Sequence, residues 1–236
     1  MCGLSTVDNR LRPRILPALA LFAAAATAAA GAAEPAATIP DLTGEEAARL
    51  ERGEAVVRLV PIRGQPDREG LAARLLPWPP ERLFRAVADA DHWSEWVPFL
   101  ERSERSRDPD GAPVWSLAFD LPLPLRDRRY RARVAAVEPA GGAPGRWTVS
   151  WASIPGSGNV ARARGSFSLR AHGPGRTLVV FRTATDTGDR TPRLLQERAL
   201  LESLPWVLDG LRQQVGRCRY TVPWPDGCRE ERPWSP

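Results

Sequence analysis

The sequence predicts an α+β fold in which a curved antiparallel sheet wraps around one long C-terminal helix. Residues 100–185 contain six strand-like segments that are separated by turn signals, with no helical pattern between them. Residues 192–215 then place leucine at helical spacing. Because the strands are apolar on one face only, we expect the helix to pack against that face.

The last two strands and the helix are the clearest elements. Residues 160–170 and 177–185 alternate apolar and polar side chains on either side of a Gly-Pro-Gly turn, which predicts a hairpin. Thr191 is expected to cap the helix, with Pro192 in its first position. Pro205 should kink the helix without ending it. The expected buried face of the helix consists of Leu194, Leu201, Leu204, Leu208, Leu211 and Val215.

Shorter elements precede the meander. Residues 43–46 read Thr-Gly-Glu-Glu, a capping box for a short helix. Strand candidates at residues 55–62 and 71–77 follow, and a second helix opens at the prolines 79 and 80. A third short helix is expected at residues 92–96.

The meander strands share one apolar face. Every second residue of the segments 115–121, 130–136 and 147–151 is expected on that face, while Arg129, Arg131 and Arg133 point the other way. The expected inward side chains include Trp115, Leu117, Phe119, Tyr130, Ala132, Trp147 and Trp151.

Residues 1–33 have the features of an export signal. Three arginines precede an alanine-rich apolar run, and small residues end it before Glu34. A retained membrane helix is the weaker interpretation, because the apolar run is short of the ~20 residues that span a bilayer. We therefore expect a periplasmic or secreted protein with a disordered linker at 34–42, one domain at 43–217 and a C-terminal tail at 218–236.

Two cysteines remain after removal of the signal. Cys218 and Cys228 flank a turn-prone segment beyond the long helix, in a compartment where disulfides persist. We expect them to form a disulfide that holds the tail, and two free thiols are the alternative.

Composition argues against several classes of function. The net charge is only +5, and the arginines alternate along strands, so a nucleic-acid surface is not expected. The two histidines, His92 and His172, lack partners at metal-ligand spacing. Neither a phosphate-binding loop nor a serine nucleophile elbow is present. We therefore expect no metal and no cofactor.

The order of elements resembles the START lipid-transfer domains of the helix-grip superfamily, which includes polyketide cyclases and birch-pollen-allergen-like proteins. The resemblance covers about residues 50–215. Its local features are the segments 79–84, 89–93, 96–98, 122–127, 154–169 and 186–192, which read PPERLF, DADHW, WVP, PLPLRD, IPGSGNVARARGSFSL and DTGDRTP. It implies the helix-grip fold and a cavity for apolar molecules between the terminal helix and the sheet.

Side chains on the apolar face are therefore candidates for the cavity wall, although core packing is the alternative for each aromatic. Small residues on the 160–170 strand would leave room for a ligand. The opposite register would turn Arg162 and Arg164 inward and require an anionic head group or paired carboxylates to offset their desolvation. The candidate wall is Trp115, Leu117, Phe119, Tyr130, Trp147, Trp151, Ala161, Ala163, Gly165, Phe167, Leu201, Leu204 and Leu208.

Arg126 and Asp127 are candidate polar groups of the cavity, with a salt bridge at its rim as the alternative. We expect a monomeric, non-enzymatic protein that binds a hydrophobic small molecule or lipid and contacts membranes transiently. The alternatives are a cyclase or aromatase of the same superfamily, and a structural envelope protein whose cavity is filled.

Overall fold

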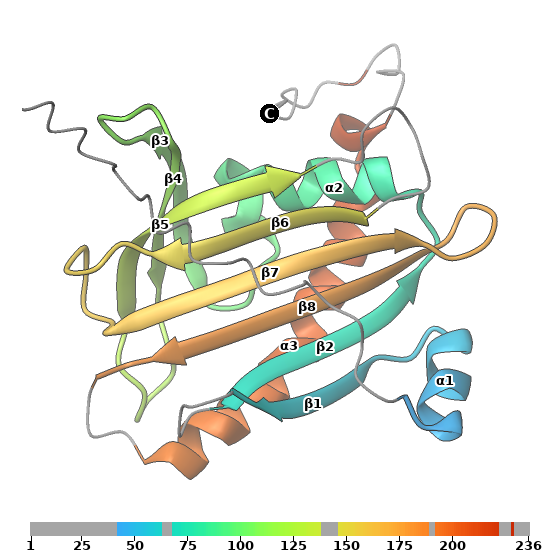
Figure 1. The fold of residues 1–236 in the computed structure, drawn as a ribbon, viewed down its shortest axis with the longest axis horizontal. Helices are drawn as coiled ribbons and strands as arrows, with labels where there is room; N and C mark the ends of the chain where they lie inside the picture. Colours follow the sequence, from blue (N-terminus) through green and yellow to red (C-terminus); the bar gives the residue numbers. More distant parts are fainter. Residues whose placement is uncertain (1–41, 63–67, 138–145, 189–191, 222–227, 229–236) are drawn as a thin grey trace, which may run out of the picture. The chain divides into compact units, whose positions relative to one another are not determined.

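An antiparallel sheet dominates the fold (Figure 1). The computed structural model describes residues 42–62, 68–137, 146–188, 192–221 and 228, and within these residues eight strands follow the order β1-β2-β8-β7-β6-β5-β4-β3. The expected export signal and, apart from Leu42, the linker lie outside the described residues. The strands are β1 Val56–Pro61, β2 Arg68–Leu76, β3 Leu100–Arg107, β4 Pro113–Phe119, β5 Arg128–Val137, β6 Arg146–Ser153, β7 Arg162–Ala171 and β8 Thr177–Asp186.

The strands β3 to β8 form the predicted meander, with each strand antiparallel to the next. The first two strands join its far end, because β2 pairs with β8. The prediction of a curved antiparallel sheet with a terminal helix is confirmed.

The helices are α1 Gly44–Glu51, α2 Pro80–Ala88, the 3-10 turn η1 Ala90–Glu95, α3 Arg193–Val215 and the 3-10 turn η3 Cys218–Tyr220. The predicted capping box of α1 is present, since Thr43 and Glu46 exchange hydrogen bonds. Helix α2 begins at Pro80 and buries the apolar side chains Leu83, Phe84 and Val87.

The two faces of the sheet are covered differently. Helices α2 and α3 and the turn η1 pack on the inner face and share its main core, whereas α1 packs with Leu71, Ala73 and Leu75 in a smaller core on the outer face. Alternation along β2 explains both cores, because Ala72 and Leu76 point inward. Figure 1 shows α3 running along the inner side of the sheet.

Helix α3 differs from the prediction in two respects. It starts at Arg193, with Pro192 in the N-cap position and no side-chain cap, while Thr191 lies outside the described residues. Leu204, Leu208, Leu211 and Val215 are buried as expected, and the helix continues through Pro205. Leu194 and Leu201 are instead 80% and 37% exposed, because the edge of the apolar stripe that carries them turns to solvent.

The C-terminal end of α3 is fixed by polar contacts. Arg82 of α2 donates hydrogen bonds to the carbonyl oxygens of Val215 and Gly216, which α3 leaves without intrahelical partners. Cys218 and Cys228 form the disulfide expected from the sequence.

Candidate functional site

A pocket of about 410 Å³ lies between the N-terminal half of α3 and the inner face of the sheet. Its volume is within the range of about 300–1,000 Å³ that is usual for small-molecule sites. Strands β4 to β8, the turn η1 and the loops after η1 and β4 contribute to its wall. The apolar and aromatic part of the wall is formed by Trp93, Val97, Leu117, Phe119, Tyr130, Trp151, Phe167, Phe181, Leu200, Leu204 and Val207.

The inner wall is a continuous aromatic surface. The rings of Phe167 and Phe181 stack with centroids 4.6 Å apart, and Phe119 stacks on Tyr130 at 6.2 Å. Trp151 lies against Trp93, with ring centroids 5.2 Å apart. Because aromatic pairs in these geometries stabilise one another, this wall is held in place even where it faces the pocket.

Tyr130 is a buried polar group on the pocket wall. Burial raises the pKa of its phenol to about 12, and a hydrogen bond with the Trp151 side chain acts in the opposite direction. An indole N–H only donates, so in this pair the Tyr130 oxygen accepts and its own proton remains able to donate. At neutral pH the pocket therefore contains an uncharged O–H donor.

Arg128 is a buried charged residue that lines the same pocket, with only 6% of its surface exposed. It lies two positions before Tyr130 on β5, on the same face of the strand. In the sheet Arg128 is opposite Phe119, and Tyr130 is opposite Leu117. The pocket thus combines an apolar interior with the buried guanidinium group of Arg128 and the phenol of Tyr130.

The loop between β6 and β7 supports this part of β5, which extends beyond the end of β6. The Asn159 side chain accepts a hydrogen bond from the Arg129 N–H at 2.8 Å, and Ser157 Oγ accepts one from the Arg131 N–H at 3.0 Å. Gly158 allows this close approach, because a Cβ there would lie 1.7 Å from the Arg129 carbonyl oxygen. The loop therefore fixes the strand segment that carries Arg128 and Tyr130.

The pocket opens between exposed aromatic residues. Phe99 and Trp206 both line it, are 39% and 52% exposed, and have ring centroids 6.0 Å apart. Phe99 has a φ of 61°, a conformation that costs a non-glycine residue energy and is common at functional sites. Polar residues also line the pocket, among them Glu197, which forms a salt bridge of 2.8 Å with Arg193.

Several predicted wall residues do line the pocket and others lie elsewhere. Leu117, Phe119, Tyr130, Trp151, Phe167 and Leu204 face it. Leu208 is buried in the core beyond the pocket, Leu201 faces solvent, and Trp147 packs on Phe84 with ring centroids 5.1 Å apart. Trp115 is buried behind Trp93, outside the pocket wall.

Strand β7 adopts the register that turns Ala163 and Phe167 inward, while Arg162 and Arg164 form ion pairs with Asp186 and Glu69. The small residues of this strand nevertheless leave no room for a ligand. A Cβ on Gly165 would lie 2.2 Å from the Trp151 ring, so that ring fills the space. Ala163 is buried away from the pocket, and Ala161 lies before the strand and is exposed.

Arg126 and Asp127 are exposed and do not line the pocket. Asp127 organises the loop after β4 instead, since its carboxylate accepts a hydrogen bond from the Leu121 N–H at 3.2 Å. Its carbonyl oxygen accepts a second bond from Asn159. Arg128, which directly follows Asp127 in the sequence, is a buried charged residue that does line the pocket.

The prediction missed Arg128, Trp93, Phe99 and Trp206. The period-two pattern that identified Tyr130 also places Arg128 on the inner face, so a signal for it was present. Trp93, Phe99 and Trp206 come from a 3-10 turn, a loop and the edge of a helix, where periodicity carries no signal.

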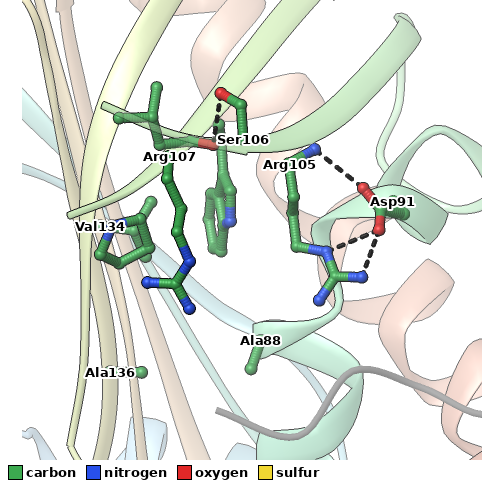
Figure 2. A pocket seen from close by; sticks show the side chains of 10 residues that line it. Ala88, Asp91, Arg105, Ser106, Arg107, Val134 and Ala136 are labelled. Atoms are coloured by element: carbon green, nitrogen blue, oxygen red, sulfur yellow. Dashed lines mark hydrogen bonds and ion pairs between the residues drawn. The ribbon is translucent and has the colours of Figure 1, made fainter. Parts of the chain in front are cut away.

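A second cavity of about 330 Å³ lies further along the inner face, beside β3, β4 and β5 (Figure 2). Val134 and Ala136 of β5 form one side of it. On the other side Arg105 of β3 pairs with Asp91 of η1, with Nε and Oδ2 2.6 Å apart. Trp115 lines this cavity but does not line the main pocket.

Outside these cavities, Asp89, His92, Gln214 and Tyr220 form a buried polar cluster at the C-terminal end of α3, which we call the anchor. Asp89 is fully buried and lies 2.7 Å from His92 Nδ1, and it accepts a hydrogen bond from Tyr220 at 3.1 Å. Burial raises the pKa of Asp89, and His92 and Tyr220 partly offset that effect. Within the described part of the chain no three metal-binding side chains gather, and no helix is long and apolar enough to cross a membrane.

Comparisons with known proteins agree with this geometry. Residues 72–216 match the family described as polyketide cyclase / dehydrase and lipid transport. A STAR-related lipid transfer protein from Xanthomonas axonopodis has 22% identity and a TM-score of 0.58 over 68% of this chain and 93% of its own. Human StAR-related lipid transfer protein 5 has 13% identity and a TM-score of 0.56 over 69% and 82% of the two chains.

An aromatase/cyclase from Streptomyces sp. R1128 has the same fold, with 17% identity and a TM-score of 0.51 over 66% of this chain and 96% of its own. The comparison with curated proteins finds no match. At these identities the solved structures establish the fold, and the chemistry of the site has to come from its own residues.

Proposed function

Because the chain belongs to the polyketide cyclase / dehydrase and lipid transport family, we propose that its main pocket binds a hydrophobic or amphipathic, lipid-like molecule. The observation that carries this proposal is the pocket of about 410 Å³ with an aromatic interior under α3. Binding is driven by burial of apolar surface, at about 25 cal/mol per Å².

Arg128 and Tyr130 orient the ligand. An apolar chain occupies the aromatic interior, and a carboxylate or carbonyl oxygen accepts hydrogen bonds from the guanidinium and the phenol. Because in this proposal only these two groups bind the polar end of the ligand, we expect selectivity for a class of amphiphile and not for one compound.

The protein acts as an exported carrier in this proposal. The signal-like residues 1–33 and the Cys218–Cys228 disulfide support a periplasmic or secreted location for one domain, residues 43–217. The exposed Phe99 and Trp206 at the opening suit brief contact with a lipid surface during exchange. N-terminal sequencing of the mature protein should begin within a residue or two of Glu34, and an intact Met1 would contradict export.

Binding is tested with delipidated protein and single fatty acids and phospholipids, by titration of tryptophan fluorescence and by native mass spectrometry. Ser203 lines the pocket and Leu201, on the same helix, does not. We expect Ser203→Trp to fill the pocket and abolish binding, and Leu201→Trp to bind as the wild type does. Absence of binding by the wild type to all these lipids would favour a structural protein with an unused cavity.

Tyr130 gives a second candidate function, that of a cyclase or aromatase. A buried phenol donor in an apolar pocket stabilises an enolate oxygen as the donors of an oxyanion hole do. Its raised pKa makes it a poor proton donor at neutral pH, however, so it polarises a carbonyl without transferring its proton readily. Incubation with a poly-β-ketone, followed by mass spectrometry for loss of water, tests this activity against Tyr130→Phe.

A further inference from the structure

The two cavities lie one after the other along the same pair of strands. On β4 and β5, Leu117 and Tyr130 are opposite each other and line the main pocket. Trp115, two residues before Leu117 on β4, is opposite Ala132. The next residues on the same face, Pro113 of β4 and Val134 of β5, line the second cavity. Both cavities therefore belong to one trough on the inner face, with Trp115 at the boundary.

Three tryptophans form the partition between them. Trp115 contacts Trp93 with ring centroids 4.6 Å apart and Trp151 at 6.0 Å, and Trp93 contacts Trp151 at 5.2 Å. Trp93 and Trp151 line the main pocket, while Trp115 lines the second cavity. Trp115 is only 2% exposed, and its ring lies between the rings of Trp93 and Trp151 and the second cavity.

We propose that Trp115 is the stop that limits the length of the ligand. This inference rests on the proposed function, since it takes the ligand to be an amphiphile whose chain enters the main pocket. The chain extends from Arg128 past Tyr130 toward the tryptophans and ends at the Trp93–Trp151 surface, which Trp115 supports from behind. Without the Trp115 ring, the Trp93 and Trp151 side chains lose the support behind them and can move apart, so that the chain passes between them into the second cavity.

The second cavity is suited to receive such an extension. Val134 and Ala136 give it an apolar side (Figure 2). The Arg105 and Asp91 side chains neutralise each other on the opposite side, so they impose a smaller desolvation cost on an apolar chain than an isolated charge would. Arg107, which also lines the cavity, is exposed and donates a hydrogen bond to the Gly111 carbonyl oxygen, so its charge can stay in contact with water. Its volume of about 330 Å³ is comparable to that of the main pocket.

The test uses a series of saturated fatty acids of increasing length and compares wild type with Trp115→Leu and Trp115→Phe. For the wild type, affinity should rise about fourfold for each methylene that becomes buried, and then stop rising at one length. In Trp115→Leu the rise should continue to longer chains. Trp115→Phe, which retains an aromatic ring and disturbs the core least, should show a smaller extension of the limit.

Two controls separate a stop from a general loosening of the core. Trp147 lines neither cavity, so Trp147→Leu removes the same type of side chain and should leave the length limit unchanged. Ala136→Trp fills the second cavity from its far side. Added to Trp115→Leu, it should restore the wild-type limit, and alone it should not alter binding.

The outcomes are distinct. If wild type binds no fatty acid of any length and none of the phospholipids, the proposed function fails, and the inference that rests on it fails too. If wild type binds fatty acids but shows no length limit, or if the limit is the same in both folded Trp115 variants, the inference about Trp115 is overturned while the carrier function stands. An extended limit in Trp147→Leu would also overturn it.

Discussion

The two halves of α3 serve different purposes although they form one continuous helix. Beyond Val207, the last residue of the helix on the pocket wall, the C-terminal half buries Leu208, Leu211 and Val215 against the sheet and α2, and its end is held by Arg82 and the Asp89–Tyr220 contacts. The N-terminal half covers the pocket, and its Leu194 and Leu201 are exposed. One half supplies stability and the other half forms a wall that ligand contacts.

This division shows where a ligand can enter with little cost to the fold. Segments with few buried contacts open more readily than the core. Pro205 lies at the junction of the two halves, where its missing N–H removes one backbone hydrogen bond of the helix. We therefore expect the N-terminal half to move during ligand exchange while the C-terminal half stays fixed.

The largest contrast is expected between two leucines of the helix. Leu208→Ala leaves a cavity in the anchored half and should lower the free energy of unfolding by about 2–5 kcal/mol. Leu201→Ala, on the exposed edge, should change it by no more than about 0.5 kcal/mol. Urea unfolding followed by circular dichroism measures both. Equal losses would contradict the division into two halves.

Removal of the Cys218–Cys228 disulfide, which lies just beyond the C-terminal end of α3, tests how much this end of the fold contributes to stability. Cys218→Ser with Cys228→Ser removes a bridge across a sequence separation of 10 residues, which should cost about 2–3 kcal/mol of stability in the chain-entropy model. Fatty-acid affinity should not change, because neither cysteine lines the pocket. A loss of affinity at a temperature where the variant is folded would contradict the division of α3, because it would show that the C-terminal half affects ligand binding in the pocket.

The sequence predicted the architecture well because strand and helix periods are local properties. The alternation along residues 100–185 and the capping box at Thr43 needed only neighbouring residues. The same alternation found the inner aromatic wall, including Tyr130 and Phe167. It could not find Trp93 or Phe99, because these residues reach the pocket from a 3-10 turn and a loop.

Side-chain volume was the other source of error. Gly165 was expected to leave room for a ligand, but it is the direct cross-strand partner of Trp151, whose ring covers it. Space beside a small residue depends on the neighbouring strand, and pairing register is not a local property of the sequence. For the same reason the leucine stripe of α3 did not reveal which of its edges faces solvent.

Substitutions of two glycines, Gly210 and Gly70, test the same difference between the two halves of α3 with smaller expected changes in stability. A Cβ on Gly210, in the anchored half, would lie 2.2 Å from the Trp96 carbonyl oxygen, so Gly210→Ala should cost about 1–3 kcal/mol. A Cβ on Gly70 of β2 would meet the side-chain carbons of Leu200 and Leu204 at 2.8–2.9 Å. Because these side chains can shift, Gly70→Ala should cost less stability but alter fatty-acid affinity, which titration of both variants would show.

The smallest expected effect is the loss of stability at alkaline pH that comes from two buried tyrosines, Tyr130 and Tyr220. Tyr130 lies on the pocket wall and Tyr220 in the anchor, and burial raises the pKa of both phenols. A raised pKa means that the folded state keeps the proton longer than the unfolded state does. The stability that this contributes is complete below pH ~10, the ordinary tyrosine value, and is lost as the pH rises toward the folded pKa.

For Tyr130 the window is therefore about pH 10 to 12, and near pH 11 the loss should be about 1 kcal/mol. Tyr130→Phe should remove this part of the alkaline decline, at the cost at pH 7 of one neutral hydrogen bond, because the buried Trp151 N–H loses its acceptor. Tyr220→Phe should also reduce the decline but lower stability at pH 7 by more, because the carboxyl group of the buried Asp89 loses a hydrogen-bond donor. Thermal unfolding at pH 7, 10 and 11 distinguishes the two variants, and identical profiles would show that pocket wall and anchor respond as one unit.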